Sequence, residues 1–69
     1  MDMNKSDLLI RLSEIIDSYI DDASLAQQLK GSIAPFRVKY VLGELEIHKK
    51  RPFTQRDVDD IKDIYFNFC

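Results

Sequence analysis

The segment from Phe36 to Arg51 constrains the fold most, because it is both rich in apolar residues and the most basic part of the chain. A helix turns by about 100° per residue, which gives this segment two apolar faces. One face carries Val38, Val41, Leu42 and Leu45, and the opposite face carries Phe36, Tyr40 and Ile47. A helix of this kind needs packing on both faces, either from the first and last helices of the chain or from a partner.

The same segment can also form a β-hairpin over residues 36–50, with a two-residue loop at Gly43 and Glu44. The helix is favoured because Pro35 suits a first helical turn and because Glu44 and His48 have supporting i,i+4 spacing. An isolated hairpin is also only marginally stable. Gly43 counts against the helix, since an interior glycine costs about 1 kcal/mol relative to alanine unless it lets another helix approach closely. We therefore predict an all-α bundle of three to four short helices, with an α+β fold as the alternative.

A first helix is predicted from about Ser6 to Ile20, with Asn4 or Ser6 as its cap. Its apolar residues form one broad stripe, and Arg11 falls outside that stripe. Ile10 is the single large apolar residue on the wrong side. It is therefore a candidate contact for a partner.

A second, shorter helix is predicted after Asp22 or Ser24, either of which can cap it. Gly31 provides a natural stop for this helix. The residue before a proline is disfavoured in the helical region, and Pro35 itself suits only the start of the next helix. The central helix is therefore expected to begin at Pro35 and to end at Lys50 or Arg51.

The last helix is predicted over residues 55–68, because three local signals agree on its start. Thr54 can cap it, Asp57 occupies the capping-box position, and Phe53 can pack onto its first turn as a hydrophobic staple. Aspartate replaces the usual glutamate or glutamine, so the box is imperfect. Phe66 points away from the predicted inward stripe. That stripe consists of Val58, Ile61, Ile64, Tyr65 and Phe68.

The length of 69 residues allows one domain, covering residues 1–69, and a core of this size rarely supplies more than about 3–5 kcal/mol. The single cysteine, Cys69, cannot form an internal disulfide, which favours a reducing, cytoplasmic setting. The sequence shows no secretory leader and no run approaching the ~18 apolar residues of a membrane span. We expect a cytoplasmic protein without a membrane partner.

Charge is unevenly placed along the chain, although the net charge is only −2. Residues 1–29 carry two basic and six acidic side chains, and residues 30–51 carry six basic and two acidic ones. A basic centre between acidic ends can be an electrostatic footprint for nucleic acid. The alternative, which we favour, is that the acidic helices lie beside the basic helix of the same molecule.

Residues 24–51 resemble a helix-turn-helix motif, with a short helix, a turn containing Gly31 and a second helix. The resemblance implies a small DNA-binding regulator. Glu44 and Glu46 interrupt both charged flanks of the second helix, so neither flank is a clean phosphate-binding stripe. The candidate nucleic-acid contacts are Arg37, Lys39, Lys49, Lys50 and Arg51.

Catalytic and metal sites find little support in the sequence. His48 is the only histidine, and no nucleophile is placed beside it. The aspartates within residues 57–63 interleave a helical apolar stripe, unlike a calcium loop, which turns around a glycine. We predict no catalytic residue, metal, cofactor or small-molecule substrate.

Surplus apolar surface is the feature that points to a function. A central helix that is apolar on two faces, together with three aromatic residues near the end of the chain, exceeds what one small core readily hides. We therefore predict a non-enzymatic protein-protein interaction or regulatory module that binds a partner protein or itself as a homodimer. Two alternatives are the helix-turn-helix regulator and a structural subunit that folds fully only in its complex. The candidate partner contacts are Ile10, Phe36, Tyr40, Ile47, Tyr65, Phe66 and Phe68.

Overall fold

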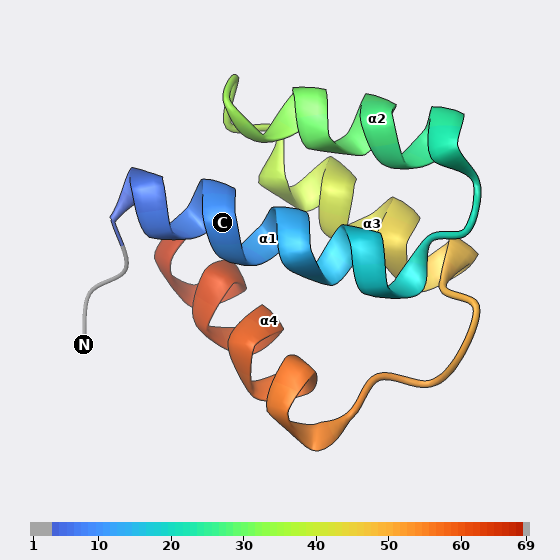
Figure 1. Cartoon of the computed structure of the whole chain (residues 1–69). Helices are drawn as coiled ribbons and strands as arrows, with labels where there is room; N and C mark the ends of the chain where they lie inside the picture. Colours follow the sequence, from blue (N-terminus) through green and yellow to red (C-terminus); the bar gives the residue numbers. More distant parts are fainter. Residues whose placement is uncertain (1–3, 69) are drawn as a thin grey trace.

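The computed structural model describes residues 4–68 and contains helices and no strand within that range (Figure 1). This confirms the all-α fold and rules out the hairpin at residues 36–50. Within residues 4–68, none of the helices is long and apolar enough to cross a membrane. The prediction about Cys69 lies outside the described residues. The helices are α1 (Lys5–Tyr19), α2 (Ala23–Ile33), α3 (Val38–His48) and α4 (Gln55–Phe68).

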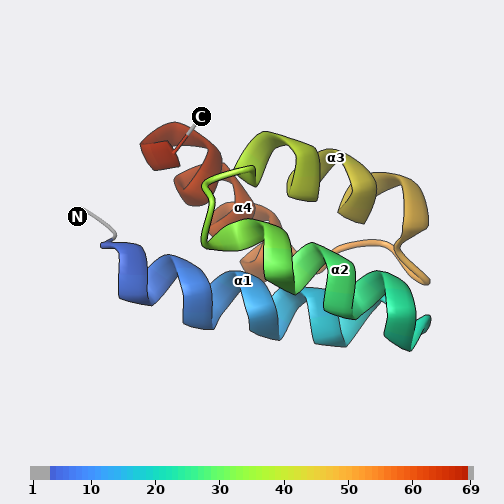
Figure 2. The ribbon, with the colours of Figure 1, turned by 90° about the horizontal axis from the view of Figure 1, so that it is seen from above.

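The helices α2 and α4 lie on opposite sides of α1 and α3. Both α2 and α4 contact α1 and α3, and they do not contact each other. The helices α1 and α2 run side by side in opposite directions, and α4 crosses beneath α1 (Figures 1 and 2). The radius of gyration is 10.9 Å, against about 11 Å expected for a chain of this length.

The core is built mainly on α1, whose apolar stripe is almost fully buried as the sequence predicts. The helix α3 contributes Val38, Val41 and Leu45, which confirms one of its two predicted apolar faces. The residues predicted for the opposite face are only partly covered: Tyr40 is half-buried, Ile47 is 73% exposed, and Phe36, which lies in the turn before α3, is 51% exposed. The helices of the same molecule therefore do not cover this apolar surface completely, which leaves part of it exposed to solvent. The fully buried side chains are Leu8, Leu12, Ile15, Ile16, Tyr19, Leu29, Ile33, Val38, Val41, Leu45 and Ile64.

Side-chain caps define the start of three helices. Asn4 accepts a hydrogen bond from the Asp7 amide at 2.8 Å, and the Asp22 carboxylate accepts from the first amides of α2. Thr54 Oγ1 accepts from the Asp57 amide at 3.2 Å. Of the alternatives that the sequence offered, Asn4 and Asp22 are the caps, and Ser6 lies inside α1.

The turn between α2 and α3 differs from the prediction. Helix α2 continues through Gly31 to Ile33, and α3 begins at Val38 rather than at Pro35. The Phe36 amide donates to the Ile33 carbonyl at 2.9 Å, and the next amide, of Arg37, donates to the Ser32 carbonyl at 3.1 Å. These two bonds form a Schellman motif, which satisfies the last carbonyls of α2.

The turn also keeps Ala34 in the helical region despite the proline that follows it, with φ −59° and ψ −40°. At its other end, α3 stops at His48, before the predicted Lys50 or Arg51. The Lys50 amide instead donates to the Tyr19 carbonyl of α1 at 2.8 Å, which turns the chain toward α4.

Candidate protein-binding surfaces

An aromatic surface forms where the start of α1, the turn before α3 and the end of α4 meet, at the same end of the molecule in Figures 1 and 2. The rings of Phe36 and Phe68 are stacked, with centroids 6.3 Å apart and planes 19° apart. Lys5 Nζ lies 4.8 Å from the centroid of Phe36. Tyr65, one helical turn before Phe68, is half exposed. We call Lys5, Phe36, Tyr65 and Phe68 the aromatic end surface.

Phe36 adopts a backbone conformation that phenylalanine rarely takes. Its φ is +62°, at the position of the Schellman motif that glycine usually fills. A side chain with a Cβ costs about 1–2 kcal/mol there. Burial of about half of the residue, together with the stacking on Phe68 and the contact with Lys5, offsets a similar amount of free energy. The other half of the residue stays exposed, so a large part of the ring remains open to a partner.

The solvent side of α3 carries a second candidate surface, which we call the outer face of α3. It consists of Lys39, Tyr40, Gly43, Glu46 and Ile47. A Cβ added to Gly43 would meet no atom within 4 Å, so no helix of the same molecule exploits the glycine. Tyr40 is half-buried, and its hydroxyl accepts a hydrogen bond from Gln28 of α2 at 3.0 Å.

The seven predicted partner contacts are thus divided among several places. Phe36, Tyr65 and Phe68 belong to the aromatic end surface, whereas Tyr40 and Ile47 lie on the outer face of α3. Ile10 and Phe66, which are 63% and 88% exposed, project from α1 and α4 on the sides away from the core. Tyr65, predicted to face inward, is half exposed instead.

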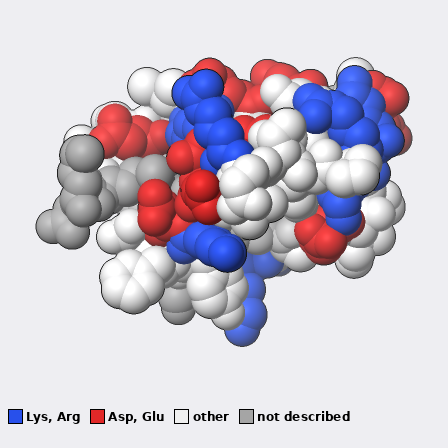
Figure 3. Space-filling view, turned by 90° about the horizontal axis from the view of Figure 1, so that it is seen from below, with Lys and Arg blue, Asp and Glu red and all other residues white. Residues whose placement is uncertain are grey.

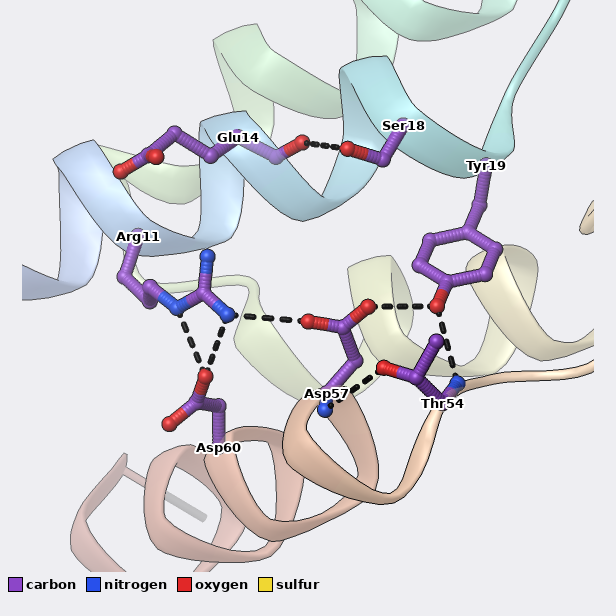
Figure 4. Close-up of polar contacts among 7 residues, drawn as sticks. All are labelled: Arg11, Glu14, Ser18, Tyr19, Thr54, Asp57 and Asp60. Atoms are coloured by element: carbon purple, nitrogen blue, oxygen red, sulfur yellow. Dashed lines mark hydrogen bonds and ion pairs between the residues drawn. The ribbon is translucent and has the colours of Figure 1, made fainter.

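A polar cluster joins α1 to α4 and was not predicted (Figure 4). Two nitrogens of Arg11, Nε and Nη2, donate hydrogen bonds to Asp60 Oδ2, and the bond from Nε is 2.8 Å long. Arg11 Nη2 also donates to Asp57 Oδ1 at 2.9 Å. The Tyr19 hydroxyl donates to Asp57 and accepts from the Thr54 amide at 3.0 Å. The carboxylate of Asp57 is therefore used between helices rather than to close a capping box.

The hydrogen bond from Tyr19 lowers the pKa of Asp57. Partial burial acts in the opposite direction, but contacts with Thr54 and the positive charge of Arg11 lower the pKa further. Asp57 is therefore ionised at neutral pH and holds α4 against α1. Among the aspartates within residues 57–63, Asp57 and Asp60 thus help to hold the fold together.

The basic residues of the candidate DNA-binding segment are mostly engaged within the molecule. The guanidinium groups of Arg37 and Arg51 lie over the rings of Tyr40 and Tyr19, 4.9 and 4.2 Å from the centroids. Lys49 pairs with Glu46 at 2.7 Å and also lies over the Phe53 ring, and Lys50 pairs with Asp21 at 2.9 Å. Lys39 makes no ion pair with any residue from 4 to 68.

Ion pairs between segments of opposite charge support the idea of internal charge matching. Lys30 pairs with Asp17 of α1 at 2.9 Å, as Lys50 does with Asp21. On the face seen from below in Figure 3, acidic and basic side chains are interleaved. This face does not offer an extended surface of one sign to a phosphate backbone.

The arrangement of α2 and α3 also differs from a helix-turn-helix. In that motif the two helices cross at roughly 90–120°. Here α2 and α3 lie side by side and run in nearly opposite directions in both views (Figures 1 and 2). The pair is better described as an αα-hairpin closed by the Schellman motif.

An open depression of about 550 Å³ lies between the start of α2 and the end of α3. Most of its polar side chains already have a partner in the molecule. Lys50 pairs with Asp21, Asp22 caps α2, and His48 Nε2 lies 3.3 Å from Glu44 Oε2. Residues 4–68 contain no cluster of three or more His, Cys, Asp or Glu side chains able to hold a metal. The lining residues are Ile20, Asp21, Asp22, Leu25, Gln28, His48 and Lys50.

Comparison of the chain with protein-family models, with curated proteins and with solved structures finds no significant match. The surfaces described above are therefore the features of the chain that indicate a function.

Proposed function

We propose that the protein is a non-enzymatic interaction module that binds a partner protein through the aromatic end surface. The observation that carries this proposal is Phe36, which holds φ at +62° while half of it remains exposed. Glycine at this position would close the same turn without the steric cost. A phenylalanine is better explained if its ring is buried in a complex.

The composition of the surface supports the same proposal. Aromatic side chains are enriched in the cores of protein interfaces, and a few of them usually provide most of the binding energy. Phe36 and Phe68 are already stacked, so little side-chain freedom is lost when a partner covers them. The cation of Lys5 beside the Phe36 ring favours a partner with an apolar pocket and an acidic side chain at its rim.

The test uses the Phe36→Gly variant, which removes the ring and relieves the backbone at once. Relief of the backbone offsets the loss of the half-buried ring, so we expect its free energy of unfolding to stay within about 1 kcal/mol of the wild type. Its affinity for the partner should fall at least about tenfold, as for a hot-spot residue. Proteins captured by the wild-type chain from the native host are identified by mass spectrometry. The affinity of each purified candidate is then measured by calorimetry for both chains.

Gly31→Ala is the matched control, since it alters an exposed position in the last turns of α2 and leaves the aromatic end surface intact. Its affinity for the partner should equal that of the wild type. The proposal fails if no captured protein distinguishes Phe36→Gly from the wild type, or if Gly31→Ala weakens binding equally.

A further inference from the structure

The outer face of α3 combines a glycine that the monomer does not need with an isoleucine that the monomer does not bury. Gly43 lies in the interior of the helix, where glycine lowers helix stability, and a Cβ there would meet nothing within 4 Å. Ile47, one turn later, is 73% exposed. Glycine in a helix allows another backbone to approach closely. The face therefore has the features of a helix-packing site without its second helix.

The charges on this face identify the second helix. Lys39 and Glu46 are seven residues apart, so they lie on the same flank of α3. Tyr40 and Ile47, also seven residues apart, lie on the other flank. If an identical helix packs antiparallel with Gly43 at the crossing point, a two-fold axis brings Lys39 of each copy beside Glu46 of the other. The same axis brings Tyr40 of each copy against Ile47 of the other.

We infer that the outer face of α3 is a self-association surface, and that its occupant is the antiparallel α3 of a second copy of this chain. Neither charged side chain is held in a buried ion pair. Lys39 makes no ion pair within residues 4–68, and Glu46 pairs with Lys49 at an exposed position. A single helix face is small by the standards of stable complexes, so the dimer is weak, with a dissociation constant in the micromolar to millimolar range.

This inference concerns a surface distinct from the aromatic end surface and goes beyond the proposed function. Its tests need no other protein. Phe36→Gly should weaken binding to the partner and leave self-association unchanged. The proposed function and this inference can therefore be refuted independently of each other.

The first test compares Gly43→Gln with Gly31→Gln by sedimentation equilibrium over a range of protein concentrations. Both substitutions replace an exposed helical glycine that has open space around it, so both should raise the melting temperature. Only Gly43→Gln should abolish self-association, because its side chain occupies the crossing point. Association of the Gly43→Gln variant at wild-type strength, or a monomeric wild type at millimolar concentration, would overturn the inference.

The second test exchanges the charges. In Lys39→Glu homodimers and in Glu46→Lys homodimers both ion pairs become like-charge pairs, so the dissociation constant should rise about tenfold in each. A mixture of these two variants restores both pairs, and heterodimers should therefore predominate. Circular dichroism checks that α3 remains helical in both. Random pairing makes half of all dimers heterodimers. If the mixture shows no more heterodimer than this, the copies do not meet in this orientation.

Discussion

The Tyr19 hydroxyl on α1 bridges two groups at the start of α4, since it donates a hydrogen bond to the Asp57 carboxylate and accepts one from the Thr54 amide. The tyrosine is fully buried, and the Phe53 ring packs edge-on against it with centroids 4.7 Å apart. Tyr19 therefore fixes the position of the first turn of α4 relative to the core.

Removing this hydroxyl should destabilise the fold. In Tyr19→Phe the Thr54 amide and the Asp57 carboxylate both lose a partner in a part-buried site, which costs about 1–3 kcal/mol of unfolding free energy. Urea denaturation measures this difference. The control is Tyr65→Phe, which changes a half-exposed tyrosine and should have no measurable effect. Equal losses in the two variants would contradict the role assigned to Tyr19.

The low pKa of Asp57 predicts acid sensitivity of a defined kind. Because its pKa is lower in the folded than in the unfolded chain, Asp57 stabilises the fold above its unfolded pKa of about 3.9, and this contribution is lost as pH falls through the folded value. Asp57→Asn should be less stable than the wild type at pH 7. Its stability should also fall less as the pH is lowered from 5. Unfolding curves at several pH values test this, with the exposed Asp63→Asn as control.

The ion pair between Arg11 and Asp60 should contribute more than an ordinary surface pair. Both side chains are less than a third exposed, and two guanidinium nitrogens reach the same carboxylate oxygen. A double-mutant cycle with Arg11→Met and Asp60→Asn should give a coupling free energy of about 1 kcal/mol. The more exposed pair of Glu46 and Lys49 should give only a few tenths. Similar values for the two pairs would show that the cluster does not anchor α4.

Binding to duplex DNA should be weak and insensitive to sequence. Four of the five candidate side chains are held by aromatic rings or carboxylates of the same molecule. Affinity measured against salt should fall with a log-log slope of about −0.9 for each phosphate neutralised, and binding should vanish at physiological salt. Sequence-selective binding that persists at physiological salt and is lost in Lys39→Glu would revive the DNA-binding hypothesis.

Metal ions and nucleotides should leave the melting temperature unchanged. A ligand that binds only the folded state at 100 times its dissociation constant adds about 2.7 kcal/mol, which raises the melting temperature of a domain of this size by roughly 10 °C or more. Thermal scans with zinc, calcium, magnesium and ATP therefore provide a sensitive test. A dose-dependent rise with any of them would identify a site that neither sequence nor geometry indicates.

Local signals in the sequence were sufficient to predict most of the secondary structure. Caps and apolar periodicity act over a few residues, so Asn4, Asp22 and Thr54 mark the helix starts correctly. Contacts between distant residues leave no such signal. Arg11 and Asp57 are 46 positions apart, and the sequence alone placed Arg11 on the solvent side of its helix.

The turn before α3 was mispredicted for a related reason. Gly31 and Pro35 are strong local signals for a helix end and a helix start, but the Schellman bonds of Phe36 and Arg37 outweigh both. The sequence gives no indication that a phenylalanine would adopt a left-handed conformation. The sequence alone therefore identified Phe36, Tyr65 and Phe68 as candidate partner contacts. It did not predict that these residues would lie together at one end of the molecule.

The attachment of α4 has a consequence for how the native protein fluctuates. Among the described residues α4 contributes only Ile64 to the fully buried core, and it has no contact with α2. Its amides should therefore exchange with solvent deuterium through a partial opening in which α1, α2 and α3 stay folded. When α4 opens in this way, the contact between Phe68 and Phe36 is lost. A ligand that contacts both rings would therefore bind only the closed state. Such a ligand would slow exchange along the whole of α4, including turns that it never touches.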